Sequence, residues 1–245
     1  MQIDYSLLSE VGGRELNEDY VLASKKDNSL CAVLCDGLGG HDGGELASRC
    51  VCETIIELFD DSDCIESLED FLKSSLEEAQ RRLLEKQVLE KKPNGLKTTV
   101  CCVLITEKAA AAIYVGDSRI YRFSGNRIVC RTADHSIPQF LVQAGEIKEK
   151  EIRYHPDRNK LLKVMGIEWE TPQYQLWPIP EASPGDSYLL CSDGFWELID
   201  ENQMQWQHLL SKDTESWLKG MKKIVERKGR GKNMDNFSAI VISVK

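Results

Sequence analysis

The chain has 245 residues, 42% of them hydrophobic and 29% charged, which is an ordinary balance for one soluble globular domain. Its formal net charge of −9 provides no general attraction to nucleic acid or to anionic lipid, so we expect neither as a partner. The start of the chain lacks the pattern of a signal peptide, and the apolar run 109–115 is too short to span a bilayer. We therefore expect a cytoplasmic protein without a membrane span.

The spacing of apolar residues predicts a block-wise arrangement of strands and helices. In chain order these are strands at 2–9, 19–24 and 30–35, helices at 45–59 and 65–89, strands at 98–105, 110–115, 119–123 and 127–131, a short helix at 137–144, strands at 173–177 and 187–191, helices at 203–210 and 214–227, and a strand at 237–244. The polar stretch 148–160 is expected to be a mobile surface loop.

This order predicts the fold class. Strands and helices do not alternate one by one, so a doubly wound parallel sheet is not expected. We predict an α+β fold, a four-layer α/β/β/α sandwich in which two mainly antiparallel sheets pack together and helix pairs flank them.

The chain contains nine cysteines, an odd number, and no two of them form a C-x-x-C pair. Because several lie within apolar strand segments, we interpret them as reduced, mostly buried thiols. A redox or zinc-binding role is the alternative, and the missing ligand spacing disfavours it.

Aspartates stand at the ends of apolar strand segments. Asp36 and Asp193 each end one, and Asp235 directly precedes the last. One such aspartate is most simply a turn residue, but three can converge on one rim of a sheet. Converged carboxylates repel one another unless a cation lies among them, and oxygen ligands favour hard ions such as Mg²⁺ or Mn²⁺.

Six short motifs resemble, in the same order, those of the type 2C family of metal-dependent protein serine/threonine phosphatases, in particular its compact bacterial-type members. They lie at residues 12–19 (GGRELNED), 36–41 (DGLGGH), 115–121 (VGDSRIY), 132–136 (TADHS), 191–194 (CSDG) and 235–238 (DNFS). They extend over nearly the whole chain, and six matches in order are highly specific.

The resemblance implies a dinuclear metal site. Asp36 would bridge two Mn²⁺ or Mg²⁺ ions, and the backbone carbonyl of Gly37 would bind one of them. Asp193 and Asp235 would complete the coordination of the other. Two such cations can activate a shared water for in-line attack on phosphorus.

Other residues gain roles from the same resemblance. Glu18 and Asp19 would act mostly through bound waters, since such cations retain several waters. Asp117 would help to hold a weaker third cation. Arg14 would clamp the substrate phosphate, because its planar guanidinium suits two-point contact with phosphate oxygens.

The sequence departs from the family pattern at two places. Leu38 stands where some members have a histidine after Asp-Gly. His41 is then a candidate proton donor to the leaving alkoxide; otherwise it packs against the turn and a water donates the proton. Lys97 stands where the family usually has a glycine. It is either a solvent-facing residue or an added positive charge at the rim of the site. His135 is more consistent with a structural role.

The predicted function is hydrolysis of phosphoserine and phosphothreonine in proteins. We expect one phosphatase domain over residues 1–245, a flap at about 137–166 that governs substrate choice, and a monomer. Phosphoprotein substrates, including a cognate serine/threonine kinase, are the expected partners. The alternatives are a pseudophosphatase that binds phosphoproteins without hydrolysing them, and a phosphatase of an anti-sigma-type regulator.

Overall fold

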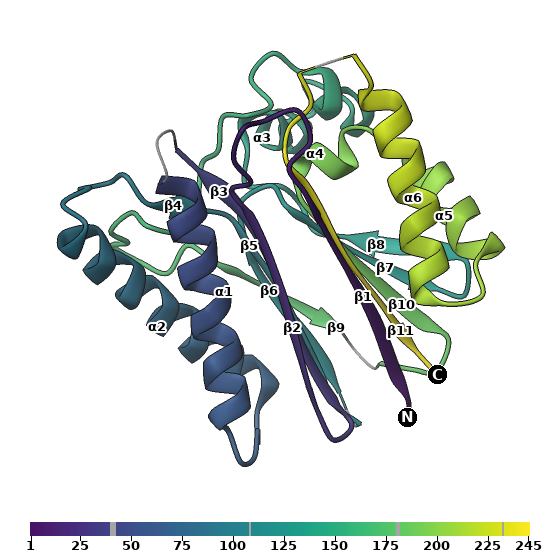
Figure 1. The fold of residues 1–245 in the computed structure, drawn as a ribbon, viewed down its shortest axis with the longest axis horizontal. Helices are drawn as coiled ribbons and strands as arrows, with labels where there is room; N and C mark the ends of the chain where they lie inside the picture. Colours follow the sequence, from purple (N-terminus) through teal and green to yellow (C-terminus); the bar gives the residue numbers. More distant parts are fainter. Residues whose placement is uncertain (40–42, 108, 180–181, 232) are drawn as a thin grey trace.

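Two antiparallel sheets lie face to face in the computed structural model, and a pair of long helices covers the outer surface of each (Figure 1). The structure describes residues 1–39, 43–107, 109–179, 182–231 and 233–245. The four-layer α+β sandwich predicted from the sequence is confirmed. Among the described residues, no helix is long and apolar enough to cross a membrane.

The first sheet has the strand order β1-β11-β10-β7-β8. Its strands are β1 (Ile3–Glu10), β11 (Phe237–Val244), β10 (Asp186–Cys191), β7 (Arg119–Ser124) and β8 (Arg127–Arg131). The helices α5 (Glu201–Leu210) and α6 (Thr214–Gly229) cover its outer face (Figure 1).

The second sheet has the order β2-β3-β5-β6-β9. Its strands are β2 (Asp19–Lys26), β3 (Ser29–Leu38), β5 (Val100–Ile105), β6 (Ala110–Val115) and β9 (Gln175–Ile179), and the two-residue strand β4 (Lys97–Thr98) pairs with the end of β3. Its outer face is covered by α1 (Gly43–Asp61) and α2 (Leu68–Leu89). The short helix α3 (Ile137–Gln143), the 3₁₀ helix η1 (Glu149–Tyr154) and the short helix α4 (Asp193–Trp196) lie at one end of the sandwich.

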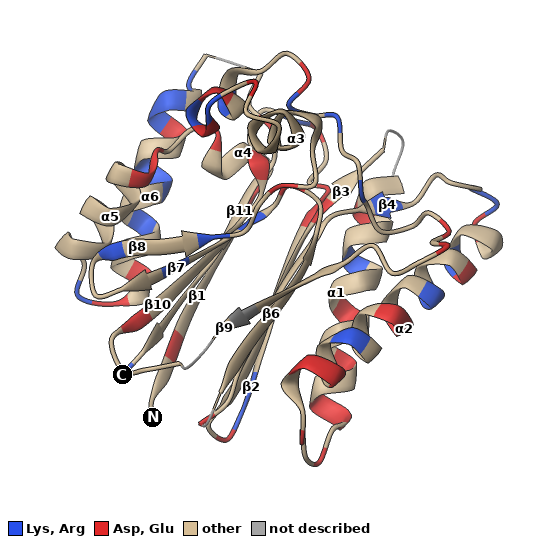
Figure 2. Cartoon of the chain, turned by 180° about the vertical axis from the view of Figure 1, so that it is seen from behind, with Lys and Arg blue, Asp and Glu red and all other residues tan. Residues whose placement is uncertain are grey.

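Strand β3 shows how the layers are built. Successive side chains of a strand point to opposite faces, so Val33 and Cys35 pack under α1 and α2 while Ala32 and Leu34 pack between the sheets. Both faces of β3 are therefore buried, which explains its continuous apolar sequence. Charged residues are instead concentrated on the helices and connecting segments (Figure 2).

The structure differs from the sequence-based prediction at α4, which was not predicted, at β9, which was predicted at 173–177, and at two segments that bear on the site. The expected mobile loop at 148–160 contains η1, whose Ile152 is 1% exposed and whose Arg153 donates hydrogen bonds to the backbone oxygens of Glu197 and Ile199. The expected strand 98–105 is divided at Thr99, where the Asp36 amide donates to Thr99 Oγ1 at 3.0 Å in place of the backbone carbonyl oxygen that a regular ladder would use. Both of these segments lie at the same end of the sandwich.

The prediction of reduced cysteines is confirmed, since all nine are free and six of them are buried. The Cys31 and Cys102 sulfur atoms lie 3.8 Å apart on neighbouring strands. The pKa of the Cys31 thiol is raised by its hydrogen bond to Cys102 and by burial, so it stays protonated and unreactive.

A buried ion pair joins β7 to the segment that follows β8. Arg119 contacts Asp134 at two points, with Nε–Oδ1 and Nη2–Oδ2 distances of 2.9 and 2.7 Å. The two side chains are 4% and 1% exposed, and the guanidinium lies 3.4 Å from the centre of the Trp196 ring. Such a pair is costly to break from one side, because the remaining charge stays buried.

We predict that Asp134→Asn lowers the free energy of unfolding by about 3–5 kcal/mol, since it leaves the Arg119 charge without its partner. Urea unfolding at constant metal concentration measures this change. The control is Glu53→Gln, which removes the exposed Arg49–Glu53 pair, whose side chains are 55% and 48% exposed. The control should cost less than about 1 kcal/mol. Equal, small losses in both variants would contradict the role given to the buried pair.

Candidate active site

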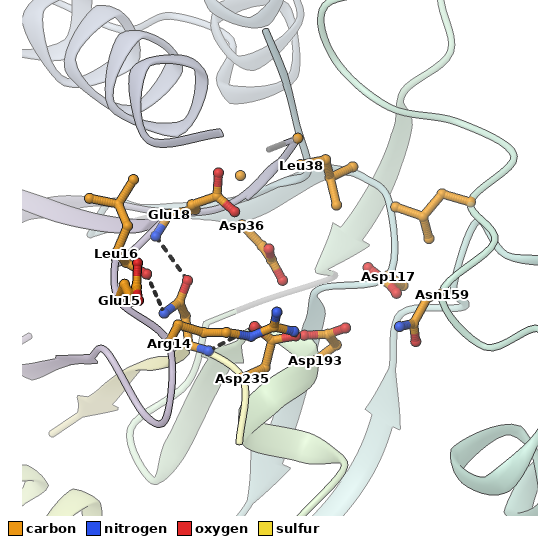
Figure 3. A pocket seen from close by; sticks show the side chains of 14 residues that line it. Arg14, Glu15, Leu16, Glu18, Asp36, Leu38, Asp117, Asn159, Asp193 and Asp235 are labelled. Atoms are coloured by element: carbon orange, nitrogen blue, oxygen red, sulfur yellow. Dashed lines mark hydrogen bonds and ion pairs between the residues drawn. The ribbon is translucent and has the colours of Figure 1, made fainter. Parts of the chain in front are cut away.

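A hollow of about 580 Å³ opens at the end of the sandwich where both sheets finish. In Figure 3 the carboxylates of Glu18, Asp36, Asp117, Asp193 and Asp235 face this space. They come from segments far apart in the sequence, and the two facing sheets bring them together. The strand-end aspartates therefore converge in the structure.

The backbone of Asp36 is fixed by the split between β4 and β5. The Asp36 amide donates to Thr99 Oγ1 at 3.0 Å, and its carbonyl oxygen accepts from the Thr99 amide and from Thr98 Oγ1, both at 2.8 Å. Asp19 lies opposite Asp36 in the β2–β3 pairing. With its backbone tied on both sides, Asp36 presents its carboxylate to the hollow (Figure 3).

Gly37 is required where helix α1 begins close to the end of β3. A Cβ atom at Gly37 would lie 2.3 Å from the carbonyl oxygen of Gly44 and 2.6 Å from that of Glu18. The Gly37 amide also donates to the Glu18 carbonyl oxygen at 3.1 Å. Only glycine fits this close approach, which keeps the Gly37 backbone on the wall of the hollow.

The first sheet contributes Asp193 and Asp235. Asp193 is the first residue of α4 and follows the last residue of β10 by two positions, and Asp235 lies two residues before β11. Asp235 Oδ2 accepts a hydrogen bond from Arg14 Nη2 at 2.8 Å. The Arg14 side chain is 47% exposed, so it can be reached from solvent. Arg14 thus lies at the hollow, as predicted, and pairs with a predicted metal ligand.

Asn236 joins the N-terminal loop to this site, which the sequence did not reveal beyond its place in the last motif. Its Oδ1 accepts from the Glu18 amide at 2.9 Å, and its Nδ2 donates to the carbonyl oxygens of Val11 and Leu16. One side chain therefore holds the loop that carries Arg14 and Glu18 against the strand that follows Asp235.

The carboxylates of the hollow are hard to ionise together. Burial raises the pKa of Asp36 well above its usual range, and the charges of Asp19 and Asp193 raise it further. The pKa of Asp193 is raised by burial and then by Asp235, and that of Asp117 by burial and then by Asp193. A bound cation would reverse these shifts by favouring the ionised forms.

Asp19 lies behind the wall of the hollow, 4% exposed. Its Oδ2 accepts from Ser192 Oγ at 2.8 Å, whereas Oδ1 has no hydrogen-bond partner within the part of the chain that the structure describes. A buried oxygen of this kind fits a metal-bound water, as expected for Asp19.

The site is a converging set of oxygens and not a closed cage. In the described ranges, no three acidic, histidine or cysteine side chains are close enough to hold one ion by themselves. Mg²⁺ and Mn²⁺ are hard ions that bind oxygen, and Mg²⁺ in particular keeps several waters in its shell. The donors present, all carboxylate or backbone oxygens, therefore fit these ions better than zinc.

The side of the hollow away from Glu18 carries Asp117 and Asn159 (Figure 3). The Asp117 carbonyl oxygen accepts from Trp196 Nε1 at 3.1 Å, which fixes its turn. Asn159 comes from the predicted flap and was not singled out as a lining residue from the sequence. Leu38 lines the rim as well, while the candidate proton donor His41 lies outside the described residues.

His135 supports the same turn. Its amide donates to the Gly116 carbonyl oxygen at 2.8 Å, its Nδ1 accepts from the Gly116 amide at 3.2 Å, and its ring stacks on Tyr114. Burial lowers the pKa of His135 to about 4, so the ring is neutral at pH 7. This is the structural role expected of His135.

The chain was compared with known proteins. The family model described as "Protein phosphatase 2C" matches residues 9–237. The "Serine/threonine phosphatase stp" of Listeria welshimeri is 29% identical over 196 residues, which is 78% of this chain and 77% of that protein.

Solved structures agree in fold. The serine/threonine phosphatase Stp1 from Staphylococcus aureus has a TM-score of 0.87 at 26% identity, over 100% of this chain and 96% of that chain. The catalytic domain of the phosphatase PstP in complex with two manganese ions has a TM-score of 0.84 at 25% identity, over 99% of both chains. With a family match over most of its length and the carboxylate site in place, this chain belongs to the protein phosphatase 2C family.

Proposed function

We propose that this metal-dependent phosphoserine and phosphothreonine hydrolase opposes a serine/threonine kinase and holds two Mn²⁺ or Mg²⁺ ions in its carboxylate-lined hollow. The observation that carries the proposal is the convergence of carboxylates from both sheets on one hollow. The metal count is supported by PstP, which was solved with two manganese ions.

Position supports the assignment of the ligands. Asp36, from the second sheet, would hold both cations, with the Gly37 carbonyl oxygen beside it and with Asp193 and Asp235, from the first sheet, across the hollow. Glu18 and Asp19 would contribute through waters. When bound, the cations would act as Lewis acids that make a water nucleophilic toward phosphorus.

Arg14 would bind the phosphate. In the structure it contacts Asp235 through one guanidinium nitrogen, and its exposed side chain leaves other donors available toward the hollow. A phosphate presents two oxygens to such a fork, and a charge-assisted contact of this geometry orients the ester for attack.

Asp117 would act near the oxygen of the leaving group. It is 5% exposed and its turn is fixed by Trp196 and His135 through backbone contacts. Asp117 would help to hold a weaker third cation, whose bound water could supply the proton to the leaving oxygen, since Leu38 cannot transfer one. The segment 137–166, proposed as the flap, lies beside it through Asn159 and Leu161.

A pseudophosphatase is less consistent with this site. Pseudoenzymes lose ligands, whereas Asp36, Asp193 and Asp235 are all present and face one hollow. We therefore propose catalysis and treat binding without turnover as an outcome that the following measurements would reveal.

We predict that EDTA abolishes hydrolysis of an aryl phosphate and that Mn²⁺ or Mg²⁺ restores it. Cation at 100 times its dissociation constant should stabilise the fold by about 2.7 kcal/mol, because it binds only the folded state. Asp36→Asn should reduce both the rate and this gain, as followed by thermal unfolding with and without metal.

Asp27→Asn is the matched control, since Asp27 is exposed in the turn at the other end of the same hairpin. It should keep wild-type activity and the full metal-dependent shift. Full activity in EDTA, or an unchanged shift in Asp36→Asn, would contradict the assignment of Asp36 as a ligand.

Arg14→Ala should raise KM for a phosphopeptide by about 10- to 100-fold, as expected for lost hydrogen bonds to a charged group. The metal-dependent thermal shift should stay nearly intact, because Arg14 binds phosphate and not cation. Arg14→Lys, which keeps the charge without the fork, should be intermediate. The exposed Arg49→Ala is the control. Lost metal binding at unchanged KM would disprove this role.

Asp117→Ala should lower kcat by about 100-fold or more, the usual contribution of assisted proton transfer. Calorimetric titration should still find two tighter cation sites, since their main ligands remain. Wild-type turnover in this variant would show that Asp117 is only a turn residue.

A further inference from the structure

Two further hollows continue the catalytic hollow across the flap. The near hollow, about 450 Å³, shares Arg14, Asn159, Asp193 and Asp235 with the catalytic hollow. The far hollow, about 830 Å³, shares Arg153 and Tyr154 with the near one. A substrate chain that enters the catalytic hollow therefore has a continuous path along η1.

The far hollow carries the cations that a second anion could use. Its described lining holds the basic side chains Arg119, Arg131, Lys150 and Arg153 and the acidic side chains Glu149, Asp200 and Glu201. Arg119 is neutralised by the buried Asp134, so Arg131, Lys150 and Arg153 are the candidates to meet an anion.

The arginines of the far hollow are held from within. Arg153 donates to the Ile199 carbonyl oxygen at 2.8 Å, Arg131 donates to the Thr132 carbonyl oxygen, and their side chains are 13% and 12% exposed. They keep their places whatever fills the hollow, so little ordering is needed on binding.

Their acidic partners are more exposed than the arginines. Glu149, paired with Arg131, is 64% exposed, and Glu201, 3.5 Å from Arg153, is 43% exposed and also accepts a hydrogen bond from the Tyr121 hydroxyl at 3.2 Å. An incoming anion would compete with these two carboxylates for the arginines, and Glu149 is the more easily displaced of the two. Asp200 is occupied elsewhere, because its Oδ1 accepts from the Gln203 amide at the start of α5.

Because the far hollow is continuous with the catalytic hollow, a group bound in the far hollow would belong to the same substrate chain. Tyr154, 81% exposed, lies on the wall shared by the near and far hollows, where it can support an extended peptide. A guanidinium group can bind two oxygens of a phosphate dianion at once. A carboxylate carries one negative charge instead of two, so the same arginines bind it less strongly.

We propose that the far hollow binds a second phosphorylated residue on one side of the phosphoresidue being hydrolysed, so that doubly phosphorylated segments are preferred substrates. This rests on the proposed function, because the first phosphate must occupy the catalytic hollow. The flap would then select substrates by charge spacing and leave the chemistry unchanged.

The test uses one phosphopeptide sequence with a second phosphoserine, a glutamate or an alanine placed at successive positions on either side. Mass spectrometry follows the loss of each phosphate, and an aryl phosphate is assayed in parallel. A second phosphoserine at the favoured spacing on one side should raise kcat/KM by about tenfold over alanine, with glutamate in between.

Lys150→Glu should remove this preference, and Arg131→Gln should weaken it. Lys148→Glu is the matched control, since Lys148 is exposed on the same segment but does not line the hollows. All three should hydrolyse the aryl phosphate at the wild-type rate.

Equal rates for all peptides, or the same preference in Lys150→Glu and Lys148→Glu, would overturn the proposal. Glutamate as effective as phosphoserine would also overturn it, by showing general acidity in place of a phosphate site. Failure of the proposed function would be distinct, because wild type would then not hydrolyse the aryl phosphate at all.

Discussion

The constraint on which the structure depends is the repulsion among carboxylates that two facing sheets bring to one end of the sandwich. Asp36 comes from one sheet and Asp193 and Asp235 from the other, and burial already raises the pKa values of Asp36 and Asp193. A fold does not hold such groups together for stability, because each one costs free energy when ionised. A divalent cation removes that cost, so the stability of this end of the molecule depends on metal binding.

Hydrogen bonds between the two sheets counter this repulsion by holding the main chain around the carboxylates in place. Ser192 Oγ donates to Asp19 in the second sheet and accepts from the Ser238 amide in the first. Asn236 ties the N-terminal loop to the strand after Asp235. Because these groups are paired, the carboxylates cannot relax apart by moving the main chain, which pre-organises the site for cations.

The strands and long helices could be predicted from sequence because alternation and helical spacing report burial, as in β3 and α1. The main carboxylates could be predicted from their place at strand ends and from the family resemblance. The 3₁₀ helix η1 could not, since its single buried residue, Ile152, lies among charged neighbours, of which Arg153 donates to carbonyl oxygens distant in the sequence. Asn159 was missed for a similar reason, because only tertiary packing of the flap places it at the hollow.

The buried Arg119–Asp134 pair connects the catalytic hollow to the far hollow. Arg119 lines the far hollow and stacks on Trp196, and the Trp196 indole donates to the Asp117 backbone. The two hollows are therefore linked by a chain of buried contacts that is rigid because its charges are paired away from water. Of the charges that η1 contributes to the far hollow, Glu149 and Lys150 are exposed, whereas Arg153 is held in place. Such a division allows the flap sequence to vary between relatives with different substrates while the residues that activate water keep their places.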